Sequence, residues 1–597
     1  MQDLGPRSSS KAFIPFDRLR AHGMYAKRLF GTAVTLTAAS LVVGCAVGPD
    51  FTRPDPPQVD RYTRQPLTTR TTSADVAGGE SQRFVQEMDI PGKWWTLFRS
   101  RGLNALIDRS LKANPTLDSA MAALRQASEN VHAQEGKYFP LIQANYTPMR
   151  EQIAQSVVGN EPIPGVSTFN LHTAQGLISY TFDLWGLNRR TVESLQAQAE
   201  SQRFLVEAAY LTLTSNVVAA AVQEASLRDQ IAATHKIIDI NSDMLGILRK
   251  QFDTGYANRI DVAVQEAQLA QVRATLPPLQ KQLAQQRDLL TALTGRFPSE
   301  EPPERFDLAT LHLPRDLPVS LPSKLIEQRP DVRSSEELLH SASAQIGVAV
   351  ANMLPDVTMT ATGGYIGQAL PGLISPETNG FWTLAGSVTQ PVFDGFTLLH
   401  LKRAAEDAYD QAAATYRSTV ISALQNVADQ LHALQEDANA LKAAAEWEHA
   451  AKISLDLSRQ QMQTGYANVL LLLAAEMAYQ QAVIAVVQAR AARLADVVAL
   501  YQALGGGWWN REDVPPPKPL VATSPATAAA PHSPPPAKLV KTDPINRLDV
   551  IQSDARTKFR LLYQTEGSDE SAVSLATSDN PMDHISAVFR DDNGRER

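Results

Sequence analysis

The sequence predicts a membrane protein of the α+β class, built from two copies of one unit that combines a β-hairpin with a very long helical hairpin. Two observations support this prediction. The pentapeptide TGYAN occurs twice, at residues 254–258 and 464–468, and landmarks that recur at a fixed period indicate internal repeats. In front of each copy, a helical pattern with almost no glycine or proline continues for about 65 residues, which is far longer than an ordinary globular helix.

The composition excludes several classes of protein. The 597 residues include 55 Lys and Arg against 63 Asp and Glu, so the formal net charge is -8. A general nucleic-acid-binding protein would carry a basic surplus, and we therefore expect no nucleic-acid partner. Hydrophobic residues make up 44% of the chain, which is enough for a core and excludes disorder throughout.

Common enzyme motifs are missing from the sequence. We find no GxSxG motif, no GxxxxGK[ST] motif and no close pair of histidines. A single cysteine, Cys45, cannot form an intramolecular disulfide or a CxxC redox pair. The adjacent carboxylates of Glu336 and Glu337 are expected to be solvated charges on a helix surface. We therefore expect no enzymatic activity, no metal site and no cofactor apart from a lipid discussed next.

The N-terminus has the pattern of a secretory signal. Lys27 and Arg28 precede an apolar run over residues 29–43, and a basic stretch before a short apolar run is typical of a signal peptide. The run is too short to span a bilayer as a mature helix. We predict a signal peptide over residues 1–44, with Met24 as the suspected true start.

The signal ends in a sequence that resembles a bacterial lipobox, Val42-Val43-Gly44-Cys45. In a lipobox the cysteine receives the lipid, and Cys45 is the lone cysteine of the chain. Ala46 follows it, which by resemblance to enterobacterial sorting favours the outer membrane. The alternative is an ordinary signal peptide that ends beside a buried cysteine. We predict lipidation of Cys45.

Further landmarks divide the chain into domain-sized parts. Phe182-Asp183 recurs as Phe393-Asp394, and Asn114-Pro115 matches Arg329-Pro330. The two copies lie about 210 residues apart. The predicted division is an N-terminal segment at 45–111, a first repeat at 112–300, a second repeat at 301–510 and a Pro-rich tail at 511–597.

Each repeat is expected to begin with one helix and two strands. The helices are predicted at 117–138 and 332–353, and the strands at 140–149, 171–182, 355–366 and 381–393. The strands alternate polar and apolar residues, as Thr358 and Thr360 do with Val357 and Met359. This alternation is typical of a membrane β-barrel, but a half-buried strand of a soluble sheet shows it as well, and periodicity alone favours the soluble sheet.

The long helices decide between these alternatives. They are predicted at 187–254, 260–294, 396–464 and 469–504, with each TGYAN as the turn between two of them. A helix of ~65 residues spans ~100 Å, which a four-stranded sheet could not cover. No later segment has 18 consecutive apolar residues, so we expect no ordinary transmembrane helix. Four strands cannot close a barrel and lipid tolerates no open edge, so several chains must pool their strands; three would give twelve.

At this point the chain resembles a known family, the TolC-like outer-membrane efflux proteins, in their lipoprotein (NodT-type) branch. The resemblance covers roughly residues 40–510 and depends on the repeat, TGYAN and four further segments: Cys45, Gly48-Pro49-Asp50-Phe51, Trp94-Trp95-Thr96-Leu97-Phe98 and Ala503-Leu504-Gly505-Gly506-Gly507-Trp508. It implies a homotrimer in which a 12-stranded β-barrel, four strands per chain, continues into a long α-helical barrel in the periplasm. A belt of short elements is implied near residues 83–111, near residues 301–325 and at the end near Gly505.

The resemblance also implies a function. Such proteins are exit channels of tripartite efflux pumps and passively export small molecules such as drugs. Their partners are a periplasmic adaptor, also called a membrane fusion protein, and an inner-membrane transporter, here of the resistance–nodulation–division type. Two alternatives stay open. One is the outer-membrane duct of type I protein secretion, and the other is a periplasmic coiled-coil scaffold without a channel.

The hairpin turns are the implied docking site for the adaptor, and the residues just after them the implied periplasmic gate. The docking residues are Thr254, Gly255, Tyr256, Ala257, Thr464, Gly465, Tyr466 and Ala467. For the gate, Asp261 matches a latching carboxylate and Leu470 an apolar constriction. Ala467 and Ala474 replace the familiar basic and acidic gate residues, so the run 470–473 favours an apolar gate. Asp456, Arg459 and Glu476 are alternative charged candidates.

Overall fold

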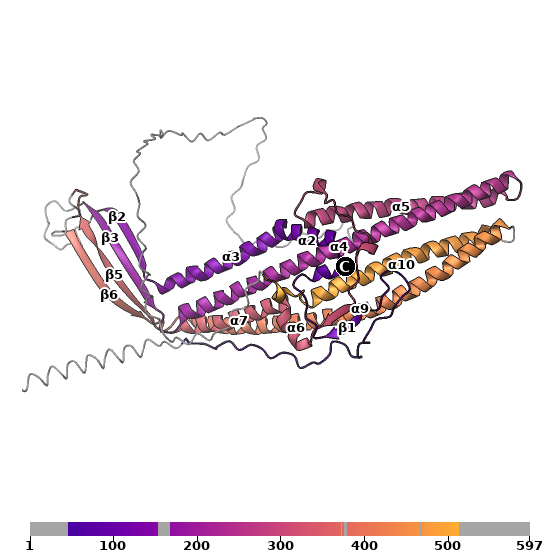
Figure 1. Cartoon of the computed structure of the whole chain (residues 1–597). Helices are drawn as coiled ribbons and strands as arrows, with labels where there is room; N and C mark the ends of the chain where they lie inside the picture. Colours follow the sequence, from indigo (N-terminus) through magenta and orange to yellow (C-terminus); the bar gives the residue numbers. More distant parts are fainter. Residues whose placement is uncertain (1–45, 153–167, 372, 375–378, 465–468, 513–597) are drawn as a thin grey trace, which may run out of the picture. The chain divides into compact units, whose positions relative to one another are not determined.

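The computed structural model describes residues 46–152, 168–371, 373–374, 379–464 and 469–512, all within one unit that ends at Pro517 (Figure 1). The second unit, Lys518–Arg597, lies outside the described residues. Several predictions therefore lie outside the described residues, namely the signal peptide at 1–44, the lipid on Cys45, the docking residues Gly465, Tyr466 and Ala467, and nearly all of the tail at 511–597.

The same order of elements occurs in both halves of the described chain: a helix, a β-hairpin and a helical hairpin (Figure 1). The first half contains α3 (Pro115–Glu135), β2 (Leu141–Glu151), β3 (Phe169–Phe182), α4 (Leu187–Asp253) and α5 (Arg259–Leu293). The second half contains α7 (Pro330–Ala351), β5 (Asp356–Gly367), β6 (Gly380–Thr389), α9 (Thr397–Gln463) and α10 (Val469–Ala503).

The predicted long helices are confirmed. Helices α4 and α9 contain 67 residues each, and α5 and α10 contain 35 each. A helix of 67 residues is ~100 Å long. The clearest difference from the prediction is β6, which ends at Thr389 instead of Phe393. Pro391 follows it and has no N–H for a ladder hydrogen bond.

The repeated Phe-Asp landmark begins each long helix. The two Asp183 carboxylate oxygens accept hydrogen bonds from the backbone N–H groups of Asn188 and Arg189, at 2.9 and 3.0 Å. In the second half, Asp394 Oδ2 accepts from the backbone N–H of Leu398 at 2.8 Å. These N–H groups have no partner inside the helix, so the acidic side chains supply the missing acceptors. Their negative charge also interacts favourably with the positive N-terminal end of the helix dipole.

The four strands form one antiparallel sheet in the order β2-β3-β5-β6. Within the described part of the chain, β2 and β6 each pair with one neighbour, so both edges of the sheet have unpaired backbone groups. Every residue of β2 and nearly every residue of β6 is exposed. A half-buried soluble sheet would cover one face, so this sheet does not match the soluble alternative.

The strand register separates the two faces of the sheet by polarity. Residues paired directly across neighbouring strands share a face, and one such row consists of Ile142, Ile178, Ala361 and Leu384. The same face also has Tyr146, Tyr180, Phe182, Val357, Met359, Tyr365, Trp382 and Val388. The opposite face is richer in hydroxyl and amide side chains, among them Gln143, Asn145, Thr147, Thr173, Gln175, Ser179, Thr181, Thr358, Thr360, Thr362, Thr383 and Ser387. Apolar side chains also lie on this face, including Leu141, Met149, Phe169, Leu171, Leu177, Ile366 and Phe381.

A belt of short elements packs around the middle of the helices. It includes β1 (Arg83–Gln86), α2 (Arg101–Ala113), β4 (Asp316–Val319) and α6 (Pro322–Gln328). Strands β1 and β4 pair in parallel, a pairing that the sequence analysis did not predict. The core of the belt is aromatic, with Trp94 stacked on Tyr501 at a ring-centroid distance of 5.3 Å.

Within the described part of the chain, two helices, α4 and α10, are long and apolar enough to cross a membrane, judged by length and composition. This differs from the expectation above, which considered only unbroken apolar runs. In α4, 56% of the apolar window is buried within the chain, and in α10 the share is 28%. Because core helices pass the same test, this finding is weak support for helical membrane spans.

Candidate functional site

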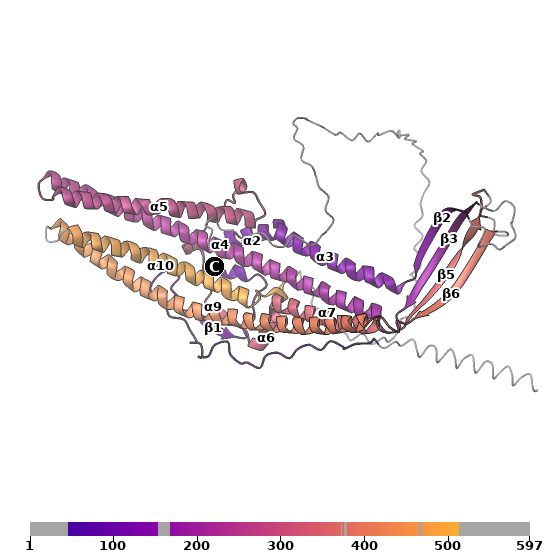
Figure 2. The same ribbon diagram turned by 180° about the vertical axis from the view of Figure 1, so that it is seen from behind.

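The turn between α4 and α5 lies at the end of the helical hairpin farthest from the sheet (Figure 2). Gly255 has a φ of 80°, the left-handed conformation that ends a helix. The backbone N–H of Tyr256 donates to the Gln251 carbonyl at 2.7 Å. The Tyr256 side chain is 87% exposed, so it presents a large ring and a hydroxyl to any partner that approaches the tip.

Asp261 takes part in a capping box at the start of α5. The Asn258 side chain accepts from the backbone N–H of Asp261 at 3.0 Å, and Asp261 Oδ2 accepts from the backbone N–H of Asn258 at 3.1 Å. Such reciprocal bonds satisfy two donors of the helix end. The carboxylate that the sequence analysis assigned to a gate latch thus has a structural task in this turn.

The second turn is described only in part. Thr464 ends α9, and its Oγ1 donates to the Gln460 carbonyl at 3.1 Å, as Thr254 Oγ1 does to the Lys250 carbonyl at 2.9 Å. Gly465, Tyr466 and Ala467 lie outside the described residues. Just after the turn, the Leu470 side chain is 66% exposed.

The alternative charged candidates for the gate differ in their exposure. Asp456 is exposed and Arg459 half-buried, whereas Glu476 is 3% exposed. The Gln265 amide on α5 donates to Glu476 Oε2 on α10 at 3.3 Å. Glu476 therefore lies between the two helical hairpins and not on the exposed tip surface.

The segment that follows Cys45 is anchored where the sheet meets the helices. We call residues 46–72 the N-terminal strap. The backbone N–H of Val47 donates to the Trp185 carbonyl at 3.0 Å. Arg190 on α4 is 4% exposed, and its guanidinium donates to the Val47 carbonyl at 3.0 Å and pairs with Asp50 at 2.7 Å. The strap therefore begins beside the junction of β3 and α4.

A family model described as outer membrane efflux protein matches residues 106–296 and 321–506, more than half of the chain. The chain belongs to this family. Among its relatives, the probable efflux pump outer membrane protein TtgC of Pseudomonas putida is 26% identical over 487 residues, which cover 81% of this chain and 96% of TtgC. Nodulation protein T of Rhizobium leguminosarum bv. trifolii is 23% identical and covers 73% and 89% of the two chains.

Solved structures agree with this assignment at the level of the fold. The outer-membrane channel OprN superposes with a TM-score of 0.69 at 24% identity, over 78% of this chain and 100% of OprN. The α+β fold is therefore that of TolC-like outer-membrane channels. Outer membrane efflux proteins are channels and not enzymes, and the relatives support a role of this chain as an efflux duct.

The strap of this efflux protein covers a buried ionic cluster that the sequence analysis missed. Glu336 and Glu337 are 4% and 8% exposed, so the expectation that they are solvated surface charges is wrong. Arg53 of the strap binds Glu336 at 2.6 Å, and Phe51 stacks on His340 with ring centroids 4.4 Å apart. Arg53, which pairs with the buried Glu336, lies 283 positions earlier in the chain, a relationship that local sequence cannot reveal.

His340 is the titratable centre of this cluster. It contacts Glu193 of α4 at 3.1 Å and Glu337 at 3.5 Å. Burial lowers the pKa of His340, but the hydrogen bonds and charges of the two carboxylates outweigh burial and raise its pKa to about 9. The imidazole is therefore protonated at neutral pH and links α4 of the first half to α7 of the second.

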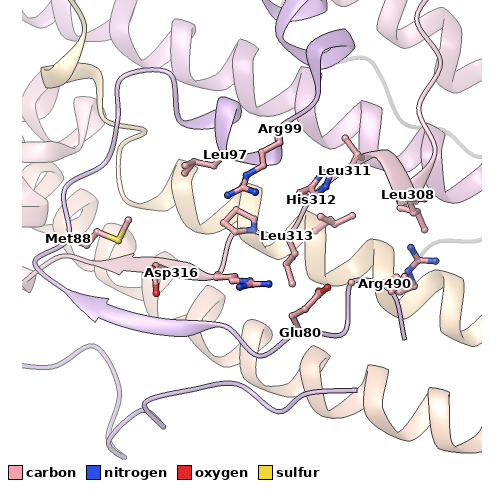
Figure 3. Close-up of a pocket in the computed structure, with 16 residues that line it drawn as sticks. Glu80, Met88, Leu97, Arg99, Leu308, Leu311, His312, Leu313, Asp316 and Arg490 are labelled. Atoms are coloured by element: carbon pink, nitrogen blue, oxygen red, sulfur yellow. The ribbon is translucent and has the colours of Figure 1, made fainter. Parts of the chain in front are cut away.

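A pocket of about 610 Å³ opens in the belt region (Figure 3). Arg99, Arg490, His312 and Glu80 are among the residues that line it (Figure 3). Asp316, also in its lining, pairs with Arg83 at 2.9 Å. Because basic and acidic side chains are mixed around the pocket, its lining does not select the charge of a ligand.

Proposed function

We propose that this chain is the outer-membrane exit duct of a tripartite efflux pump. Three copies pool their sheets into a 12-stranded β-barrel in the outer membrane, and their helical hairpins form an α-helical barrel in the periplasm. The duct passively exports small molecules such as drugs. They enter from a periplasmic adaptor and an inner-membrane transporter of the resistance–nodulation–division type. The name of TtgC as an efflux pump outer membrane protein supports this assignment.

The observation that carries the proposal is the four-stranded sheet. Its apolar face includes exposed side chains such as Ile142, Leu384 and Val388, at 72%, 63% and 71%, which suit contact with lipid. Its opposite face is richer in hydroxyl and amide groups, which suit a water-filled lumen. The backbone groups along its two edges are unpaired within the described part of the chain, and lipid does not tolerate unpaired backbone groups. Further copies must therefore pair with β2 and β6.

The helical hairpins support the periplasmic part of the proposal. Helices of ~100 Å extend from the sheet toward the tips at the two turns. The tips dock the adaptor, with the exposed ring of Tyr256 as the main anchor of the first tip. At the second tip, Leu470 of each copy forms an apolar ring that closes the duct by excluding water. Asp261, at the start of α5, contributes a charge to the gate from the first tip.

The strap supports a lipid anchor on Cys45. Ala46 lies close to Gly186 at the start of α4, since a β-carbon added to that glycine would be 2.7 Å from the Ala46 α-carbon. Neighbouring α-carbons are ~3.8 Å apart, so acyl chains on Cys45 would enter the membrane beside the base of the barrel. Mass spectrometry of the mature N-terminal peptide tests this proposal.

The duct itself is tested with the detergent-purified protein. Light scattering measures the mass of the oligomer, and liposomes loaded with a small dye measure its permeability. We expect three chains of at most 65.1 kDa each and dye release that increases when an adaptor hairpin is added. A protein that stays monomeric and soluble without detergent would support the scaffold alternative instead.

A further inference from the structure

Three buried polar side chains meet between the two helical hairpins. Asn241 of α4, Gln265 of α5 and Glu476 of α10 are 1%, 0% and 3% exposed. The Gln265 amide donates to Asn241 Oδ1 at 3.1 Å and to Glu476 Oε2 at 3.3 Å. The second of these bonds crosses from the first hairpin to the second. We call this group the inter-hairpin joint.

The joint lies inside an apolar cluster contributed by both hairpins. The cluster consists of Met244, Leu245, Leu248, Val262, Leu269, Leu455, Met462, Val469, Leu472 and Ala475. Such surroundings exclude water, so a charge placed there loses its hydration without a full replacement. Val469 and Leu472 flank Leu470 in the chain, so the cluster is continuous with the proposed constriction.

The hydrogen bonding of the joint is incomplete when Glu476 is ionised. Glu476 Oε1 and Gln265 Oε1 are buried acceptors without a partner among the described residues, and Arg459 Nε of α9 is a buried donor without one. A protonated carboxyl group gains a donor that an ionised one lacks. Two unpartnered acceptors in an apolar site are therefore better suited to the neutral acid.

We propose that, in the duct proposed above, Glu476 and Gln265 form a proton-sensitive joint that holds the second hairpin against the first and thereby sets the aperture at Leu470. In its neutral form Glu476 keeps the hairpins packed. When Glu476 ionises, separation of the hairpins hydrates the carboxylate, and the tip opens.

The charges around the joint determine the direction of this response. Burial raises the pKa of Glu476, while the hydrogen bond from Gln265 and the charge of Arg459 lower it in part. The other helices at the joint, α4 and α5, contribute the neutral amides of Asn241 and Gln265. A raised pKa in the packed state means that packing is favoured at low pH and is lost as pH rises through that value. Opening therefore increases with pH.

Conductance of the purified trimer across a planar bilayer, measured from pH 5 to pH 8.5, tests the joint. We expect the wild-type conductance to be lowest at pH 5 and to rise as Glu476 ionises, because burial raises the pKa of this carboxyl group. Glu476→Gln mimics the neutral acid and should stay at the low-pH conductance throughout. Arg459→Gln removes a charge that favours ionisation and should shift the midpoint to higher pH. The exposed Glu446→Gln is the matched control and should behave as the wild type.

The proposed role of the joint is disproved if the conductance of Glu476→Gln depends on pH as in the wild type, or if Arg459→Gln shifts the midpoint to lower pH. Absence of conductance in every variant, from protein shown to be a folded trimer, would instead count against the proposed duct. In that case hydrogen exchange of α5 and α10 still tests the joint. Protection near Gln265 and Glu476 should fall with rising pH in the wild type and stay constant in Glu476→Gln.

Discussion

Gly48 of the N-terminal strap lies directly against Gly347 of α7. A β-carbon added to Gly48 would be 2.4 Å from the Gly347 α-carbon, and Gly48 has a φ of 93°. A β-carbon on Gly347 would in turn be 2.9 Å from both the Val47 carbonyl and Arg190 Cγ. A side chain at either position would prevent this close approach of the strap to α7. The glycine pair therefore determines where the strap begins.

Gly347→Val should displace the strap from α7. Overpacking of this kind typically costs about 1–3 kcal/mol, so we expect a lower unfolding temperature and faster proteolysis near Val47. Gly246→Ala in α4 is the matched control, since an added β-carbon there meets nothing within 4 Å. Alanine is the better helix former by up to about 1 kcal/mol, so this control should be neutral or stabilising. Equal proteolysis of both variants would contradict the role of the glycine pair.

His340 should make the stability of the chain depend on pH. Its folded pKa of about 9 is raised from the ordinary 6.5, so its contribution is complete below pH 6.5 and is lost as pH rises through about 9. The unfolding temperature should therefore fall between pH 7 and pH 9.5, with a contribution of at most about 3 kcal/mol per chain. His340→Gln should flatten the dependence of the unfolding temperature on pH in this window, whereas His235→Gln, at an exposed position, should not. An unfolding temperature of the wild type that does not change with pH would refute the raised pKa of His340.

Asp261 can be tested for a gating role separately from its role in the helix cap. Asn258→Ala and Asp261→Ala both break the capping box, and each should cost about 1 kcal/mol at the start of α5. Only Asp261→Ala also removes the charge. If Asp261 latches the tip, the bilayer conductance of Asp261→Ala should exceed that of Asn258→Ala. Equal conductance of the two variants would show that Asp261 acts only in the helix cap.

Tyr256→Ala should weaken docking of the adaptor without changing stability. The side chain is almost fully exposed at the tip, and aromatic anchors dominate binding energy in protein interfaces. We expect a loss of about tenfold in affinity, or ~1.4 kcal/mol, measured by surface plasmon resonance with the periplasmic adaptor. Leu205→Ala removes a half-exposed side chain of α4 away from the tip and serves as the control. Unchanged affinity of Tyr256→Ala would show that the first tip does not dock through this ring.

The long helices and the strands could be predicted because their signals are local. The absence of glycine and proline between Phe396 and Thr464, with apolar residues at helical spacing, is sufficient to predict α9. The polarity alternation of β5 likewise indicated a strand. The alternation could not tell a soluble sheet from a membrane sheet, because that difference depends on what covers the faces.

The features that were missed depend on contacts between distant residues. Strand β1 pairs with β4 through Arg83 and Asp316, which are 233 positions apart. Gln265 and Glu476 are 211 positions apart, and Glu336 is buried under the strap. Each of these side chains is polar, so local composition predicts exposure for it, and only the tertiary arrangement shows the partner that makes burial possible.

The most direct test of the account is the conductance of the purified trimer in a planar bilayer, with the wild type compared to Leu470→Ser at fixed pH. The account predicts low conductance for the wild type and a marked increase for Leu470→Ser, because a polar ring no longer excludes water. High conductance in both would retain the channel and reject Leu470 as its gate. No conductance in either, from protein shown to be folded and trimeric, would contradict the proposal that this chain forms an outer-membrane duct.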